Sequence, residues 1–178
     1  APFGIVLVLD RLSALMVLLT SVLALIVLVH AVATNWDQKG LHFHALFQFQ
    51  LMGISGAFLT GDVFNLFVFL EISSLSSYVL ISLGQDRRAL TAAYRYLVMG
   101  TIGATFYLIG VGMMYMMTGT LNMADLATII PAVADTRTIM AALAFLTVGI
   151  SLKLALFPLH MWLPNAYTYA PSAVTVFL

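Results

Sequence analysis

The stretch 61–83, GDVFNLFVFLEISSLSSYVLISL, places a lone carboxylate, Glu71, in a segment that is otherwise apolar enough for lipid. A helix capped by Asp62 would hold Glu71 nine residues in, about 14 Å along its axis at 1.5 Å per residue. That depth is near the middle of a hydrocarbon core about 30 Å thick. Ionisable residues there cost a few kcal/mol and usually line proton or ion pathways. The stretch therefore predicts a transmembrane helix with a functional carboxylate.

Two hydroxyl side chains are spaced to share the helix face of Glu71. Ser74 and Tyr78 follow it at i+3 and i+7. Hydroxyls beside a buried carboxyl group can hydrogen-bond it or hold water, which lipid cannot do. We expect both residues to support the carboxylate.

The composition of the whole chain indicates an integral membrane protein. Hydrophobic residues make up 62%, charged residues 8%, and the mean hydropathy is +1.07. The net charge is zero and no basic tail is present, so no nucleic-acid partner is expected. The chain has no cysteine, which excludes disulfides and thiolate metal sites. With no metal-ligand set or nucleotide loop either, we expect neither a cofactor nor a bound metal.

Runs of about 20 apolar residues predict an all-α, polytopic transmembrane helix bundle that forms a single domain over 1–178. The expected helices span about 10–33, 42–60, 62–83, 89–118 and 138–157, with the start of another at 171. In the second helix, Gln48 and Gln50 are expected in the interior. The segment NMADLATIIPAVADTR is expected to be a loop, with Asp125 and Asp135 as loop or capping residues. Both chain ends lie within apolar sequence, which suggests a fragment of a longer protein.

The fifth predicted helix combines a lysine with a break. Lys153 lies within the apolar span of this helix. The helical pattern that follows is interrupted by Pro158, Pro164 and Pro171. Irregular backbone at membrane depth is tolerated only where it is buried in protein or lines a wet cavity, as in the broken helices of transporters. His160 is at i+7 from Lys153 and would share its face if the helix continued.

Three segments together resemble the antiporter-like proton-channel family of Mrp-type cation/proton antiporters, respiratory complex I and membrane-bound hydrogenases. They are GDVFNLFVFLEISSLSSYVLI, AAYRYLVMGTIGATFYLIGVGMMYMMTGTLNMADLA and SLKLALFPLHMWLPNAYTYAPSAV. The resemblance implies that Glu71 and Lys153 match the family's proton-transfer pair. It also implies that the chain is the first inverted-repeat part of a larger subunit. Arg95 stands where family members often have lysine, and we assign it no proton-donor role because arginine does not readily titrate.

Within the family, GDVFNLFVFLE, TGTLNMADLA and NAYTYAPSAV most resemble the D-subunit branch of Mrp-type Na+/H+ antiporters. This implies a transporter subunit rather than an enzyme, in the inner (plasma) membrane. Its partners would be lipid, other membrane subunits of a hetero-oligomeric complex, protons and, in that branch, Na+.

Other functions remain open at this stage. The chain could be an antiporter-like subunit of complex I, and so part of an NADH:quinone oxidoreductase, or of a membrane-bound hydrogenase. It could also be a non-transporting scaffold that binds neighbours through its glycine-rich fourth helix, with Glu71 and Lys153 as a static ion pair that docks two helices.

The positions of basic residues generate a first prediction, on topology. Arg87 and Arg88 form the densest basic spot, so the loop before the fourth helix should be cytoplasmic, with Lys39 on the same side and Arg11 and Arg137 outside. A cysteine at Gln85 should resist an impermeant maleimide added to intact cells and react after permeabilisation. Labelling of intact cells would show the opposite orientation.

Overall fold

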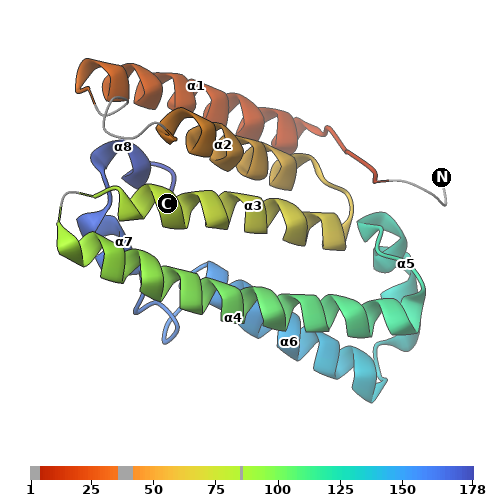
Figure 1. The fold of residues 1–178 in the computed structure, drawn as a ribbon. Helices are drawn as coiled ribbons and strands as arrows, with labels where there is room; N and C mark the ends of the chain where they lie inside the picture. Colours follow the sequence, from red (N-terminus) through yellow and green to blue (C-terminus); the bar gives the residue numbers. More distant parts are fainter. Residues whose placement is uncertain (1–4, 36–41, 85) are drawn as a thin grey trace.

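The computed structural model describes residues 5–35, 42–84 and 86–178 and is built from helices (Figure 1). These are α1 (Arg11–Ala33), α2 (Phe43–Leu59), α3 (Val63–Ser82), α4 (Arg87–Thr118), α5 (Met123–Val133), α6 (Arg137–Lys153), α7 (Leu163–Tyr169) and α8 (Ser172–Thr175). Only isolated β-bridges, and no strands, occur in these three ranges. The all-α prediction is therefore confirmed. Lys39 and Gln85, used in the topology prediction, lie outside the described residues.

Polar side chains set the starts of the long helices. A side-chain oxygen accepts a backbone N–H of the first turn at Asp10, Asp62, Asp86, Asn122 and Thr136. Each cap satisfies an N–H group that has no partner within its helix. The cap expected at Asp62 is present, with its Oδ1 2.8 Å from the Asn65 nitrogen.

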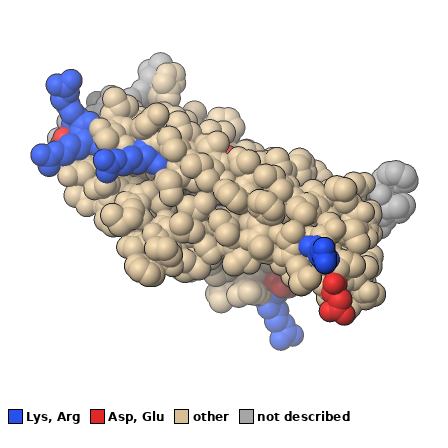
Figure 2. All heavy atoms as spheres, turned by 90° about the horizontal axis from the view of Figure 1, so that it is seen from below, with Lys and Arg blue, Asp and Glu red and all other residues tan. Residues whose placement is uncertain are grey.

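The helices form a layered bundle in which α3 lies between α2 and α4, while α1 covers α2 and α6 packs on α4 (Figure 1). Within the described residues, α1, α3 and α4 are long and apolar enough to cross a membrane, and α2 and α5 are shorter apolar helices. On the face in Figure 2, charged side chains gather towards the ends, and the middle is almost entirely uncharged. This distribution fits a surface whose middle contacts lipid.

One end of the bundle is tied by backbone hydrogen bonds. The Gly61 nitrogen donates to Val6 O at 2.9 Å, and the Met123 nitrogen donates to Gly61 O at 2.8 Å. The tight turn between α2 and α3 is thereby joined both to the segment before α1 and to the start of α5. These contacts fix the N-terminal end of α3, and with it the depth of Glu71.

Two sequence-based expectations are wrong. The segment expected to be a loop forms α5, because Asn122 caps it and Leu126 packs with Met114 and Ile139 in a small core. Gln48 is exposed whereas Gln50 is buried, since residues two apart point to different faces of a helix.

The broken helix is present, but its first half is shorter than expected. α6 ends at Lys153 rather than near 157, and Ala155 then takes a left-handed φ of 50° that a continuing helix would not contain. Pro158, a few residues on, has no N–H to offer a helix. The chain turns until α7 begins at Leu163, and α8 follows Pro171.

Glycines allow α4 and α6 to pack closely. A Cβ at Gly149 would lie 2.7 Å from Tyr107 N and 2.8 Å from Gly103 O, both backbone atoms of α4. Because small residues at such contacts let helix backbones approach, Gly149 sets the distance between α4 and α6 one turn before Lys153.

We therefore expect Gly149→Ala to destabilise the protein by about 1–3 kcal/mol, because the two backbones must separate. Thermal unfolding in detergent measures this. Gly112→Ala is the matched control: it is also a glycine within a helix of the pair, but a Cβ there meets nothing within 4 Å. Equal melting temperatures for the two variants would contradict the packing argument.

Candidate proton-transfer site

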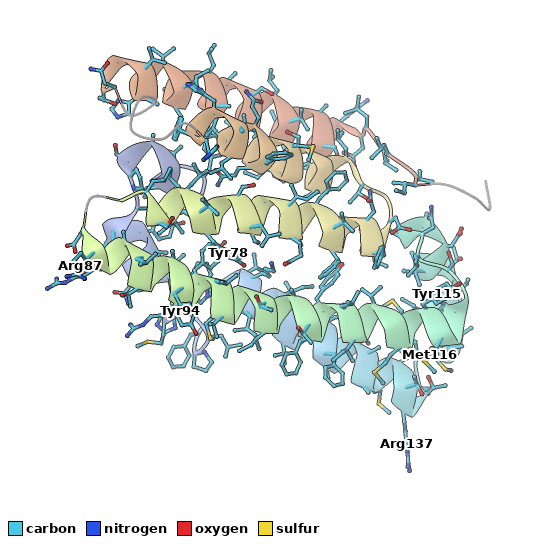
Figure 3. All side chains as sticks on the ribbon, in the orientation of Figure 1. Tyr78, Arg87, Tyr94, Tyr115, Met116 and Arg137 are labelled. Atoms are coloured by element: carbon cyan, nitrogen blue, oxygen red, sulfur yellow. The ribbon has the colours of Figure 1, made fainter. Side chains whose placement is uncertain are left out.

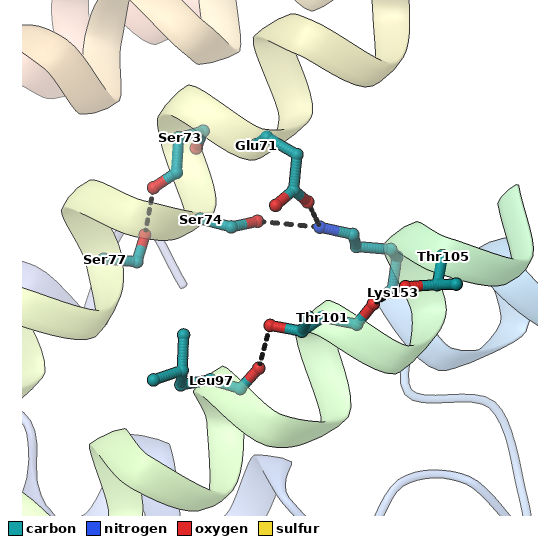
Figure 4. Close-up of polar contacts among 8 residues, drawn as sticks. All are labelled: Glu71, Ser73, Ser74, Ser77, Leu97, Thr101, Thr105 and Lys153. Carbon is teal, nitrogen blue, oxygen red and sulfur yellow. Dashed lines mark hydrogen bonds and ion pairs between the residues drawn. The ribbon is translucent and has the colours of Figure 1, made fainter. Parts of the chain in front are cut away.

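Glu71 of α3 and Lys153 of α6 meet as an ion pair (Figure 4). Lys153 Nζ lies 2.6 Å from Glu71 Oε1 and donates a second hydrogen bond, of 3.0 Å, to Ser74 Oγ. The lysine side chain is 15% exposed and the glutamate side chain 23%. In the described part of the chain no other ion pair is found. The structure thus brings Glu71 and Ser74, predicted from one stretch, together with Lys153, predicted from another.

The position of Lys153 depends on how α6 ends. A helix end leaves carbonyl groups without partners in the helix, and these are costly at membrane depth. Here Leu154 N donates to Ile150 O at 2.8 Å, and Leu156 N donates to Ser151 O at 2.9 Å. The buried indole of Trp162 donates from Nε1 to Leu152 O at 3.1 Å. The turn after α6 therefore satisfies the helix end from which Lys153 projects.

An aromatic stack connects this turn to α3 and α4. Trp162 lies parallel to Tyr96, with ring centroids 4.2 Å apart, and Tyr96 meets Tyr78 edge-on at 4.6 Å. Figure 3 shows Tyr78 between α3 and α4. The Tyr78 hydroxyl packs against Gly100 and has no hydrogen-bond partner among the described atoms. Tyr78 therefore packs against Tyr96 and Gly100, and in the described structure it makes no hydrogen bond to the ion pair.

A second buried polar contact lies further along α3. Gln50 Nε2 donates to Ser77 Oγ at 3.0 Å, and Ser77 donates to Ser73 O at 2.9 Å. The buried Gln50 Oε1 atom has no partner in the residues that are described. Sequence reasoning placed Gln50 in the interior but missed Ser77, although its i+3 spacing from Ser74 is a usable signal.

His160 is not part of the ion pair. Its ring lies against Phe157 with centroids 5.6 Å apart, and its buried Nδ1 has no described partner. Because α6 ends at Lys153, the i+7 spacing does not bring the two side chains to one helix face. Trp162, rather than His160, bonds to the last turn of α6, through the carbonyl of Leu152.

Metal-ligating side chains do not cluster in the described part of the chain. Across the described ranges no group of three or more His, Asp or Glu side chains is placed to hold an ion. The groups that meet at the site are an amine, a carboxyl group and a hydroxyl, all of which can take part in proton exchange.

Known proteins resemble this chain over most of its length. A family model described as "NADH:quinone oxidoreductase/Mrp antiporter, TM" matches residues 60–178. NADH-quinone oxidoreductase subunit N of Desulforudis audaxviator is 47% identical over 99% of this chain and 36% of its own length. The D subunit of a probable K(+)/H(+) antiporter of Rhizobium meliloti is 47% identical over 98% of the chain and 32% of its own. The D subunit of the Na(+)/H(+) antiporter of Alkalihalophilus pseudofirmus is 39% identical over 98% of this chain and 36% of its own length.

Solved structures show the same fold. The Mrp complex from Dietzia sp. DQ12-45-1b matches with a TM-score of 0.80 and 33% identity, over 96% of this chain and 32% of that chain. Respiratory complex I from Thermus thermophilus matches with a TM-score of 0.76 and 28% identity, over 95% of this chain and 36% of that chain. The chain spans about a third of the length of these relatives. It belongs to the NADH:quinone oxidoreductase/Mrp antiporter transmembrane family.

Proposed function

We propose that this chain is part of a proton-translocating subunit of a multisubunit monovalent cation/proton antiporter, with Na+ as the exchanged cation. In this proposal Glu71 and Lys153 carry the proton. The observation that supports it most is the 2.6 Å ion pair between a helix at membrane depth and the last residue of an interrupted helix.

Proton transfer at this pair follows from simple electrostatics. While Lys153 Nζ contacts Glu71, each charge stabilises the other, so the amine stays protonated and the carboxylate stays ionised. When the lysine side chain swings away, both charges lose that stabilisation in an apolar setting. The ammonium group can then release its proton to a neighbouring water, and the carboxylate can take one up. Ser74 gives the ammonium a second acceptor beside Glu71.

A static docking pair explains the arrangement less well. Buried ion pairs often stabilise a fold no better than apolar residues of similar volume, because two charges must be desolvated. The two helices that the pair joins, α3 and α6, are already connected through α4, which packs against both. In addition, a pair used only for docking gives no reason for α6 to stop at the lysine and continue as irregular backbone.

A role in a redox-driven complex is the second candidate, and the 47% identical relative named NADH-quinone oxidoreductase subunit N favours it. The same pair would then move protons in a complex driven by a redox reaction. Proton movement that requires NADH and quinone, rather than a Na+ gradient, would support this candidate over the antiporter.

The proposed surroundings follow from the same comparisons. We expect the subunit to reside in the inner (plasma) membrane, to contact other membrane subunits of a hetero-oligomeric complex, and to exchange protons for Na+. One relative is named for K(+) and another for Na(+), so exchange assays should include both cations.

Glu71→Gln should abolish cation-coupled proton movement, because an amide cannot ionise. The assay is proton flux in liposomes that contain the full-length protein with its partner subunits, under an imposed Na+ gradient. Asp125→Asn is the matched control, since it makes the same chemical change at an exposed position in α5 and should keep the parental rate. Parental flux in Glu71→Gln would refute the proposed role.

Lys153→Arg should fail to transport although it preserves the positive charge, because a guanidinium does not release its proton at accessible pH. Lys153→Ala should fail as well. Arg87→Lys, the reverse exchange at an exposed basic residue, serves as the control in the same liposome assay. Near-parental transport by Lys153→Arg would show that Lys153 is a fixed charge and that no relay passes through it.

A further inference from the structure

Two adjoining pockets lie between α4 and α7, away from the ion pair. The more polar one, of about 210 Å³, is lined by Arg88, Thr91, Ala92, Arg95, Asn165 and Tyr169. The more apolar one, of about 380 Å³, is lined by Tyr94, Arg95, Val98, Met99, Met161, Trp162 and Asn165. Arg95 and Asn165 line both, so the two pockets adjoin, and together we call them the hollow.

The polar pocket carries positive charge without a matching acid. Arg88 and Arg95 are seven residues apart and share a face of α4. In the described structure neither guanidinium has a carboxylate oxygen within 4 Å, although Asp86 caps the helix nearby by accepting the Arg88 backbone N–H. Arg88 instead donates to the Tyr169 hydroxyl at 3.4 Å and lies 6.0 Å from the centroid of that ring. The pocket is therefore suited to an anion.

The side chains that line the hollow are more polar near the start of α4 than further along the helix. Arg88 lies at the start of α4, and Arg95 lies about 10 Å further along the helix axis. Val98 and Met99 follow within one more turn, and Met161 faces them from the turn before α7. The chain thus provides cationic groups near the helix end and an apolar lining deeper in the bundle. Figure 3 shows Tyr94 on the side of α4 away from α3, so the hollow opens on the outer side of α4.

We propose that this hollow binds one anionic phospholipid. Arg88 and Arg95 bind the phosphate, Asn165 donates to it from its side-chain amide, and the apolar pocket receives an acyl chain. Arginine suits this role because its planar guanidinium matches phosphate geometry and is weakly hydrated. Basic pockets between helices near the end of a bundle are a recognised setting for anionic headgroups. The inference does not depend on the proposed transport function.

The charge of the pocket favours lipid over a protein segment as the occupant. A further helix of the longer protein would have to bring a carboxylate to the arginines and also fill the apolar pocket. A single anionic lipid supplies both groups. Its phosphate can accept several hydrogen bonds at the helix end, and its apolar chain can fill the deeper pocket. An amphiphile therefore matches both halves of the hollow with one molecule.

The test is lipid retention by the full-length protein, measured by native mass spectrometry after equilibration in nanodiscs of phosphatidylglycerol and phosphatidylcholine. We expect one phosphatidylglycerol to be retained in preference to phosphatidylcholine. Arg95→Gln should weaken that retention about fivefold, the contribution of one basic residue at an anionic surface. Arg87→Gln is the matched control, because Arg87 is a neighbouring exposed arginine of α4 that lines neither pocket.

Two further measurements distinguish the contribution of the lipid headgroup to binding from that of the acyl chain. Val98→Trp should reduce binding of dioleoyl phosphatidylglycerol by filling the apolar pocket, and dihexanoyl phosphatidylglycerol and free phosphate should bind more weakly than the long-chain lipid. Equal losses in Arg87→Gln and Arg95→Gln would overturn the proposal, since they would indicate general surface charge. Unchanged retention in Arg95→Gln, or no preference for phosphatidylglycerol, would overturn it as well.

Discussion

A charge inside an apolar helix bundle needs an opposite charge beside it, and this requirement organises the structure. Glu71 is held at its depth by the capped start of α3 and by the backbone hydrogen bonds that tie that end of the bundle. Lys153 reaches it from α6, which contacts α4 far more than it contacts α3. The pair therefore bridges two packing units, α2 with α3 and α4 with α6. Because removing one partner leaves the other charge exposed to an apolar environment, the two helices must keep this register.

The close packing of α4 and α6 serves the same requirement. Gly103 and Gly110 of α4 and Gly149 of α6 leave space for the facing backbone, so the two axes can approach. Their approach places the last turn of α6 within reach of α3 across the bundle. Fine positioning of the ammonium group thus comes from residues that carry no charge.

The sequence predicted the elements of this arrangement better than their contacts. Glu71, Lys153 and the break after it are visible because a lone charge or a proline stands out in apolar sequence. Ser74 could be placed by helical spacing alone. The role of Trp162 could not, because its bond to Leu152 O exists only after the chain has turned back on itself. The helix α5 was not predicted, because the Asn122 cap and the tertiary packing of Leu126 stabilise a short segment that was expected to be a loop.

Hydrogen bonds fix the backbone at the end of α6, whereas the charged side chain of Lys153 is less constrained. The carbonyls of Ile150, Ser151 and Leu152 are all engaged by the turn that follows, so the helix end does not depend on the lysine. The Lys153 ammonium, by contrast, is held through its hydrogen bonds to Glu71 and Ser74 at the end of a flexible four-carbon stem. Movement of the ammonium away from Glu71 therefore requires no rearrangement of α6. A helix end held by backbone hydrogen bonds, with the charge on a flexible stem, is the arrangement that the proposed opening and closing of the pair requires.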